Sequence, residues 1–493
     1  MYAAACGNSR SGNDAQPAPV TTAADVTAPT TTAPETSDGV SEPEPETSDG
    51  GSEPEPVPAD GGSEPEPSEP ETVTTTEPVV VEPVDPYPHR DEFVSRAGVP
   101  GVTGDEIRVA VVGTRSNNPL GTCILDCFVT GIQSYFDYVN DAGGIYGRRL
   151  VIGEVLDDEL GFNKDRALKI IADNRALVSF QATLLALGWG DLHDARVPTF
   201  AWNPVEGVNR DTIFGNFVIG CITCTSRGLP WLVSQAGGTR VAALGYGISA
   251  NSKLCTSAFA DSVRRYGADL GAEVVYFNDA IAFGLPNGIG PEVTQMVDAG
   301  VDFIVTCMDL NAMLTLAQEL ERQGVRGQIK MLHPNTYDRD FVASAGSLFD
   351  GDYVQVTFAA FEYEIDSGLR HAYDRWVPAN GGPVAEQTMV GWINADLFVT
   401  GLLEAGPSFD RSSIIDSLNR ITYDADGLIN PIDWSRQHTE VIEGDPTHDY
   451  ENECVSFVRM EDGAFVGFQP APWMCWPNDT LEWIEPTPTD FTR

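Results

Sequence analysis

Nine cysteines, at positions 6, 123, 127, 221, 224, 255, 307, 454 and 475, are the residues of this chain best suited to chemistry. Two pairs are closely spaced, Cys123-x3-Cys127 and Cys221-x2-Cys224. Four thiolates at such spacings can bind zinc, and a Cys-x2-Cys pair at a helix N-terminus can exchange disulfides. Without Cys6 the count is even, which favours disulfides formed in an oxidising compartment. We expect two local disulfides, with zinc as the weaker alternative.

Motifs of enzymes are missing from the sequence. There is no Gly-x-Ser-x-Gly, no P-loop, no Gly-x-Gly-x-x-Gly after a strand and no His-Glu-x-x-His. The six His are scattered singly, and the acidic segment 443–453 lacks the twelve-residue pattern of a calcium loop. We therefore expect no catalytic residues, no metal and no cofactor.

Charge excludes further classes of function. The chain of 493 residues has 29 Lys+Arg against 73 Asp+Glu and a formal net charge of −44. Nucleic acids and anionic membrane surfaces attract clustered basic residues, so neither is an expected partner. No run of 18 apolar residues predicts a transmembrane helix. The segment Ala3-Ala4-Ala5-Cys6 resembles the end of a bacterial lipoprotein signal, although Ala3 stands where Leu is usual. Cys6 is thus a candidate for lipidation, the alternative being a cysteine without a role.

An acidic repeat follows. Residues 35–67 repeat with a period of eleven, and each repeat ends in Ser-Glu-Pro-Glu-Pro. Two prolines per repeat exclude a helix, and dense negative charge with few apolar residues leaves nothing to offset the entropy of ordering. We expect residues 1–100 to be a disordered tail that spaces an anchored domain from its anchor, or one that only adds solubility.

From residue 104 onward apolar runs alternate with helical patterns. This alternation predicts an α/β fold with doubly wound parallel sheets. A first series has strands at 107–113, 150–155, 176–181, 197–202 and 216–220 and helices at 126–140 and 163–174. A second series has strands at 241–244, 273–277, 302–306 and 328–332 and helices at 256–270 and 311–323. Helices at 366–378, 385–405 and 410–420 and strands at 455–458 and 464–468 complete the chain.

The beginning of the first series resembles a known family. The run Asn140-x-x-Gly-Gly-Ile-x-Gly-Arg148, followed by a strand ending in Asp157-Asp158, is similar to the opening of the type 1 solute-binding proteins of ABC transporters, in the leucine/isoleucine/valine-binding branch. The resemblance implies the type 1 periplasmic-binding fold, with two α/β lobes joined by three crossings of the chain. Lobe 1 would be 101–222 plus 360–425, and lobe 2 would be 223–359 plus 426–493, with residues 353–359 as one crossing.

The same resemblance implies a function. The chain would be an extracytoplasmic receptor that closes its cleft on a small polar molecule and delivers it to an ABC permease without catalysis. With Cys6 lipidated, we expect it to be anchored to the outer face of the cell membrane, as a monomer. A ligand-sensing regulatory protein on the same fold is the alternative, and an α/β enzyme is a third.

Loops at the carboxyl ends of the strands are expected to hold the ligand. The first lobe offers Asn117, Asn118, Gln181, Thr183, Trp202 and Asn203, and the second offers Tyr246, Ser252, Asp309, Asn311, Asn335 and Tyr337. The resemblance implies a hydroxyl after the third strand, which Thr183 can supply, and a carboxylate near position 335. Asn335 cannot carry that charge, although Asp309 could. We expect a neutral polar ligand with a flat or apolar part against Trp202, unless Trp202 only packs.

The remaining cysteines are expected to form two further disulfides. Cys454 and Cys475 lie in the final strand region. Cys255 opens a predicted helix and Cys307 ends a predicted strand of the same lobe, so both would lie at the edge of the cleft.

Overall fold

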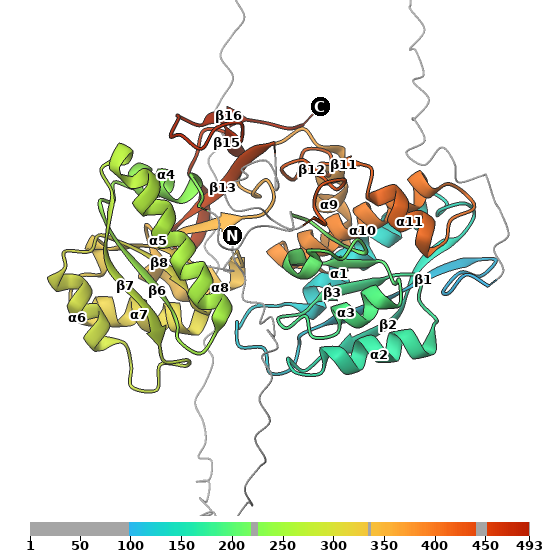
Figure 1. Cartoon of the computed structure of the whole chain (residues 1–493), viewed down its shortest axis with the longest axis horizontal. Coiled ribbons are helices and arrows are strands. Elements are labelled where there is room, and N and C mark those ends of the chain that lie inside the picture. Colours follow the sequence, from blue (N-terminus) through green and yellow to red (C-terminus); the bar gives the residue numbers. More distant parts are fainter. Residues whose placement is uncertain (1–97, 218–224, 334–336, 440–450, 493) are drawn as a thin grey trace, which may run out of the picture. The chain divides into compact units, whose positions relative to one another are not determined.

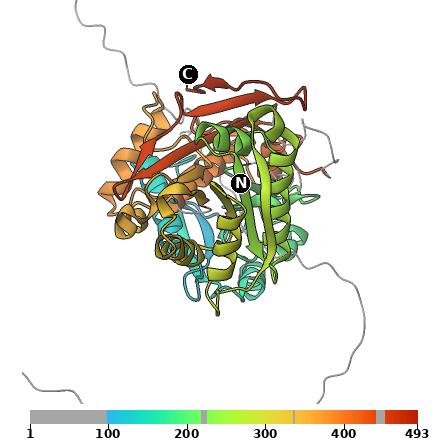
Figure 2. The same ribbon diagram turned by 90° about the vertical axis from the view of Figure 1, so that its left-hand side faces the viewer.

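The computed structural model describes residues 98–217, 225–333, 337–439 and 451–492, all within one compact unit of the chain. Two large β-sheets and their covering helices organise these residues (Figures 1 and 2). The expectations for the tail up to residue 97 and for Cys6, Cys221, Cys224 and Asn335 concern positions outside the described residues.

The first sheet is parallel throughout, with the strand order β2-β1-β3-β4-β5. Both of its faces are covered, so β1 reads as a continuous apolar run rather than an alternating one. Val109 and Val111 of β1 pack in one hydrophobic cluster, and Ala110 and Val112 pack in another on the opposite face. The strands are β1 (Glu106–Gly113), β2 (Arg149–Asp157), β3 (Ser179–Ala182), β4 (Thr199–Ala201) and β5 (Ile213–Gly215).

Helices α1, α9, α10 and α11 pack together over one face of this sheet, and α2 and α3 lie on the other. Of the 20 residues of α10, 14 are buried and most of these are apolar, as expected for a helix enclosed on most sides. The helices are α1 (Leu125–Asp141), α2 (Asn163–Asp173), α3 (Trp189–Asp194), α9 (Gly368–Ala379), α10 (Glu386–Ala405) and α11 (Arg411–Leu418), with a 3-10 turn at Pro204–Gly207.

Two glycines allow α1 and α10 to approach closely. A Cβ atom on Gly131 would lie 2.0 Å from the carbonyl oxygen of Thr388, and one on Gly391 would lie 2.2 Å from that of Phe128. Neither distance is sterically possible, so only glycine permits this packing. The contact fixes where the N-terminal turn of α10 lies beside the N-terminal half of α1.

The second sheet has the strand order β16-β15-β13-β10-β9-β8-β6-β7, and β14 pairs with β13. It is parallel from β7 to β10 and antiparallel beyond, where the C-terminal strands extend it. Its strands are β6 (Arg240–Tyr246), β7 (Glu273–Ile281), β8 (Phe303–Cys307), β9 (Lys330–His333), β10 (Tyr353–Val356), β13 (Asn452–Glu461), β14 (Ala464–Gly467), β15 (Trp473–Pro477) and β16 (Thr487–Thr489).

Helices cover both faces of the parallel part of this sheet. The hydrophobic cluster on one face includes residues of α4 and α5, and the cluster on the other includes residues of α6 and α7. These helices are α4 (Gly228–Gln235), α5 (Ala250–Leu270), α6 (Gly290–Asp298), α7 (Leu310–Arg322) and α8 (Arg339–Ala345), with 3-10 turns at Arg326–Gln328 and Gly346–Phe349. Below, the first lobe means the elements packed on the first sheet, and the second lobe those on the second.

The predicted α/β fold is confirmed, with corrections in detail. The second sheet is mixed rather than purely parallel, because the C-terminal strands reach β10 from the opposite direction. Helix α5 begins at Ala250, since the side chain of Ser249 caps it by accepting from the backbone N–H of Ser252 at 3.1 Å. Cys255 therefore lies inside this helix instead of opening it. The fifth strand of the first sheet is Ile213–Gly215, earlier than the expected 216–220.

Three disulfides lie in the described residues, and their pairing is the expected one: Cys123–Cys127, Cys255–Cys307 and Cys454–Cys475. The last pair sits directly across the antiparallel strands β13 and β15. Cys255–Cys307 joins α5 to the end of β8. A thiol oxidised in Cys123–Cys127 cannot serve the alternative zinc site.

Residues after 425, where the sequence places the end of the first lobe, contact the first sheet. The small antiparallel pair β11 (Thr422–Tyr423) and β12 (Ile432–Asp433) is followed by Trp434, whose ring centroid lies 5.2 Å from that of Phe214. His438 Nε2 lies 2.7 Å from the carbonyl oxygen of Ile213 at strand β5. We therefore propose that the first lobe continues to about residue 439 rather than ending at 425.

Candidate ligand-binding site

The loop after β1 is shaped by a carboxylate at the end of β2. Asp157 Oδ1 accepts from the backbone N–H groups of Arg115 at 3.1 Å and Glu159 at 2.9 Å, and Oδ2 accepts from the Ser116 hydroxyl at 2.6 Å. Burial opposes ionisation of this group, but these hydrogen bonds lower the pKa of Asp157 to about 2. The loop is thus held by a charge that persists at any physiological pH.

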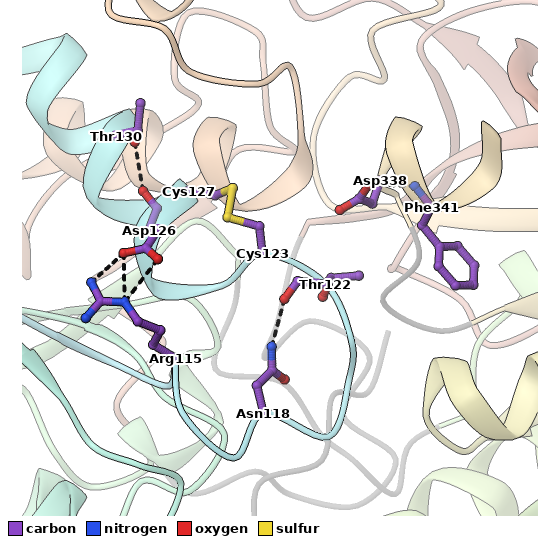
Figure 3. Close-up of a disulfide and its surroundings, with 9 residues drawn as sticks. All are labelled: Arg115, Asn118, Thr122, Cys123, Asp126, Cys127, Thr130, Asp338 and Phe341. Carbon is purple, nitrogen blue, oxygen red and sulfur yellow. Dashed lines mark hydrogen bonds and ion pairs between the residues drawn. A yellow bond between two sulfur atoms is a disulfide. The ribbon is translucent and has the colours of Figure 1, made fainter. Parts of the chain in front are cut away.

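Asn117 and Asn118 form part of this loop. Asn117 has a left-handed backbone, with φ of 58°, and its amide donates to the carbonyl oxygen of Glu159 at 3.3 Å. The Asn118 amide donates to the Thr122 carbonyl oxygen at 2.7 Å, and its oxygen accepts from the Leu120 N–H at 2.9 Å (Figure 3). Both side chains therefore shape the turn, and their contact with a ligand stays a prediction.

Gln181 and Trp202 lie in the interior of the first lobe. The Gln181 amide donates to Ser179 Oγ at 2.6 Å, and its oxygen accepts from the Asn163 amide at 3.0 Å. Trp202 is only 4% exposed and belongs to the main hydrophobic cluster. These contacts favour packing roles over binding, which for both residues stays a prediction.

Thr183 is the strongest candidate in the first lobe. It follows β3 directly and is 7% exposed, and its hydroxyl oxygen has no hydrogen-bond partner among the described residues. Leaving a buried hydroxyl unpaired costs about 1–3 kcal/mol, which a ligand can recover. Asn203, after β4, is equally buried.

In the second lobe Tyr246 and Asp309 form a pair. The Tyr246 hydroxyl, at the end of β6, donates to Asp309 Oδ2 at 2.5 Å, and Asp309 Oδ1 caps α7 by accepting from the Ala312 N–H at 3.1 Å. Burial and then this carboxylate raise the pKa of Tyr246. Ser252 Oγ accepts from the Tyr246 N–H and donates to the Cys307 carbonyl oxygen, both at 2.7 Å. The loops after β6 and β8 are thereby joined.

The two lobes touch where these loops meet. The side-chain amide of Asn311, in the first turn of α7, donates to the carbonyl oxygen of Pro119 in the loop after β1 at 3.2 Å. The structure thus brings the Asn117–Asn118 turn next to the start of α7, which Asp309 caps.

Tyr337 belongs to a different part of the second lobe. Its hydroxyl donates to Glu362 and accepts from the Phe361 N–H, and its ring stacks on Phe361 with centroids 5.5 Å apart. Burial, followed by the Glu362 charge, raises the pKa of this phenol. At 3% exposure Tyr337 is a core residue here, and its contact with a ligand stays a prediction.

Sequence reasoning missed a second meeting point of the lobes. The N–H of Glu386, the first residue of α10, donates to the Tyr337 carbonyl oxygen at 3.2 Å, and Asp338 forms an antiparallel bridge with Ala385. Burial, and then the Asp338 charge, raise the pKa of Glu386 to about 7. The signal was an acidic residue at the start of a largely apolar helix, but its partner Asp338 is 48 positions earlier in the chain, and local patterns do not detect such a pair.

Figure 3 shows the Cys123–Cys127 disulfide at the start of α1, with Asp338 and Phe341 at the start of α8 in its surroundings. No side chain caps α1, and the disulfide fixes its first turn instead. Within the ranges that the structure describes, no three His, Cys, Asp or Glu side chains gather as metal ligands. Those ranges also hold no helix long and apolar enough to cross a membrane.

Comparisons with known proteins agree with this architecture. A fatty acid ABC transporter substrate-binding protein from Thermomonospora curvata superposes with a TM-score of 0.54 at 16% identity, covering 80% of this chain and 95% of its own. An ABC transporter substrate-binding protein from Desulfitobacterium hafniense in complex with Leu gives 0.57 at 15% identity, covering 74% and 100%. A solute-binding protein from R. palustris in complex with benzoate gives 0.56 at 16%, covering 73% and 95%.

At these identities the solved structures show a shared fold, the type 1 periplasmic-binding fold. Curated proteins provide no match. The sequence profile of one family, described as periplasmic binding protein, matches residues 106–464, which include the whole first sheet and the second sheet from β6 to β13. The chain belongs to the periplasmic binding protein family.

Proposed function

We propose that the chain is an extracytoplasmic receptor that binds a small polar molecule, such as an amino acid or an amide, and delivers it to an ABC permease. The observation that carries this proposal is the contact between the two lobes at the carboxyl ends of their strands, where Asn311 at the start of α7, just after β8, donates to the carbonyl oxygen of Pro119 in the loop after β1 at 3.2 Å. Parallel sheets bind ligands beyond the carboxyl ends of their strands. A ligand that touches both lobes stabilises their approach, and the closed form then docks on the permease.

The candidate side chains favour an uncharged or zwitterionic ligand. Thr183 and Asn203 offer a hydroxyl and an amide, and the Asp309 carboxylate is already engaged by Tyr246 and by the α7 cap. The structurally similar proteins are named for ligands as different as leucine, benzoate and a fatty acid. The fold alone therefore does not determine the ligand. The side chains in the loops at the carboxyl ends of the strands must do so.

The location of the receptor is part of the proposal. Binding proteins of this family act outside the cytoplasm and are not enzymes. We propose that a lipid on Cys6 anchors the chain to the outer face of the membrane as a monomer, with the acidic repeats as the spacer. Mass spectrometry of the membrane-extracted protein tests the lipid, and unmodified Cys6 would contradict it.

A thermal-shift screen of the full chain tests the proposed binding. The panel contains amino acids, amides, short carboxylates including benzoate, polyols and nucleosides, because a ligand that binds only the native state raises the midpoint of unfolding. We expect a shift with one class, and a shift with none would contradict the proposal. Loss of uptake of that compound in cells without the protein separates a transport receptor from a sensor.

Thr183→Val sharpens this test, since it removes the hydroxyl and keeps the shape of the side chain. We expect binding of the compound found in the screen to weaken about tenfold, the value of one hydrogen bond to a bound ligand. The matched control is Thr294→Val on the exposed face of α6, which should bind as the wild type does. Equal affinity in the Thr183 variant would remove this residue from the site.

A further inference from the structure

Asp338 and Glu386 place one carboxylate from each lobe at the contact between segments 337–338 and 385–386, which we call the seam. Glu386 starts α10, which packs on the first sheet, and Asp338 caps α8, which follows β9 of the second sheet. Their backbones are held together by the bond from the Glu386 N–H to the Tyr337 carbonyl oxygen and by the bridge between Asp338 and Ala385. The separation of these two acids therefore depends on how the lobes sit.

The hydrogen-bond donors and basic side chains around Asp338 and Glu386 bind other groups. The Tyr337 hydroxyl donates to Glu362, and Asp338 Oδ1 accepts from the Phe341 N–H at 3.0 Å. In the described part of the chain, no donor reaches the Glu386 carboxylate. The basic side chains of the surrounding elements pair with other acids: Arg339 with Glu362, Arg370 with Asp374, and Arg115 with Asp126.

Three influences therefore act on the protonation of Glu386. Burial is the largest and Asp338 is the second, and both favour the neutral acid. The N-terminus of α10 favours the charged form, but it does not reverse the direction. When the lobes separate, water reaches Glu386 and Asp338 moves away, so the pKa of Glu386 returns toward its ordinary 4.5.

We propose that closure of the two lobes takes up a proton at Glu386, so that the Asp338–Glu386 seam makes closure pH-dependent. This rests on the proposed receptor function, because it assumes that the lobes open and close. Between pH values of about 4.5 and 7 the closed form binds one more proton than the open form. By linkage, the ratio of closed to open molecules then rises up to about tenfold for each unit that the pH falls. Above neutrality Glu386 is charged in both the closed and the open form, and the dependence ends.

The experiment follows lobe closure in the full chain without any ligand. One dye is placed on the exposed Arg175 of the first lobe and one on the exposed Glu321 of the second, and energy transfer is measured from pH 5 to pH 9. We expect the closed fraction of the wild type to rise as the pH falls below 7. Glu386→Gln, which mimics the protonated acid, should give a flat profile near the low-pH value of the wild type.

Two further variants keep the result interpretable. Glu404→Gln makes the same change at the exposed C-terminal turn of α10 and should keep the wild-type profile. Asp338→Asn retains a capping side chain for α8 and should move the midpoint to lower pH. A wild-type profile that does not change with pH, or a Glu386→Gln profile that matches the wild type, would overturn the proposal.

Failure of the seam and failure of the receptor function give different results. If closure depends on pH as expected but no compound of the screening panel binds, the role of Glu386 in closure is supported and the proposed receptor function is contradicted. If a compound binds and closes the lobes while Glu386→Gln leaves the pH profile unchanged, the receptor function is supported and the role of Glu386 is contradicted.

Discussion

Helix α10 carries two partly buried acids whose surroundings differ. Asp396 accepts hydrogen bonds from the hydroxyls of Tyr135 at 2.6 Å and Tyr423 at 2.7 Å, and all three residues belong to the first lobe. Glu386, at the start of the same helix, has no such donor in the described residues and faces Asp338 across the lobes. An acid with permanent partners holds a fold together, whereas one whose surroundings change with a neighbouring lobe can report where that lobe is.

Burial raises the pKa of both acids, but the hydrogen bonds act on only one of them. At Asp396 the two phenols lower the pKa and partly offset burial, and at Glu386 the nearest charge, Asp338, adds to burial. The same helix thus presents a structural acid in the middle of a lobe and a responsive acid at its edge. The predictions that follow test whether that distinction is real.

The largest effect is expected from removing the structural acid. Asp396→Ala removes the carboxylate that accepts from the buried hydroxyls of Tyr135 and Tyr423. The Tyr423 hydroxyl keeps the Ile393 carbonyl oxygen, at 3.1 Å, as a second acceptor, and a buried hydroxyl that loses its partner costs about 1–3 kcal/mol. We expect the free energy of unfolding to fall by roughly 2–5 kcal/mol in urea denaturation. Asp424→Ala, which changes an acid of the neighbouring loop, is the control. A loss below about 1 kcal/mol would show that Asp396 is not structural.

Glu386→Gln is expected to raise the free energy of unfolding, and to do so only at high pH. The folded pKa of about 7 lies above the ordinary 4.5, so the proton-linked stability of Glu386 is complete below pH 4.5 and lost as the pH rises through 7. The neutral amide avoids that loss. Allowing for partial exposure, we expect a gain of about 2 kcal/mol at pH 8 and none at pH 4.5. Denaturation at both pH values measures this, and equal gains at both would contradict it.

Single helices and strands could be predicted from the sequence, whereas pairs of residues distant in the chain could not, for a physical reason. Local patterns sufficed for the β1 strand, for the helix expected at 126–140 and for the α/β alternation, since each depends on neighbouring residues. Ser249 as the cap of α5 was a local signal that went unused. Glu386 with Asp338, and Asp396 with Tyr135, meet only after folding and left no periodicity to detect. Trp202 illustrates the converse, because position after a strand could not distinguish a ligand contact from a core side chain.

A smaller effect is expected from removing one donor of the structural acid. Tyr135→Phe keeps the ring in its T-shaped contact with Trp392, at 5.0 Å between centroids, and removes the hydroxyl bound to Asp396. We expect a loss of about 1 kcal/mol, the usual net value of one hydrogen bond. The pKa of Asp396 should rise further, which makes it more like Glu386. Stability as a function of pH checks both parts, and an unchanged pH profile would mean that Tyr135 does not tune this acid.

The smallest effect tests whether burial alone raises the pKa of Glu386, or whether the charge of Asp338 contributes. Asp338→Asn removes the charge facing Glu386 but keeps a side chain that caps α8, so at pH 4.5 stability should stay within about 0.5 kcal/mol of the wild type. At pH 8 the variant should gain less than about 1 kcal/mol, because burial is the larger influence and remains. The telling quantity is the midpoint of the pH dependence, which should move to lower pH. If it stays in place, Asp338 does not act on Glu386, and the two lobes are not coupled through their acids even though Glu386 titrates near neutrality.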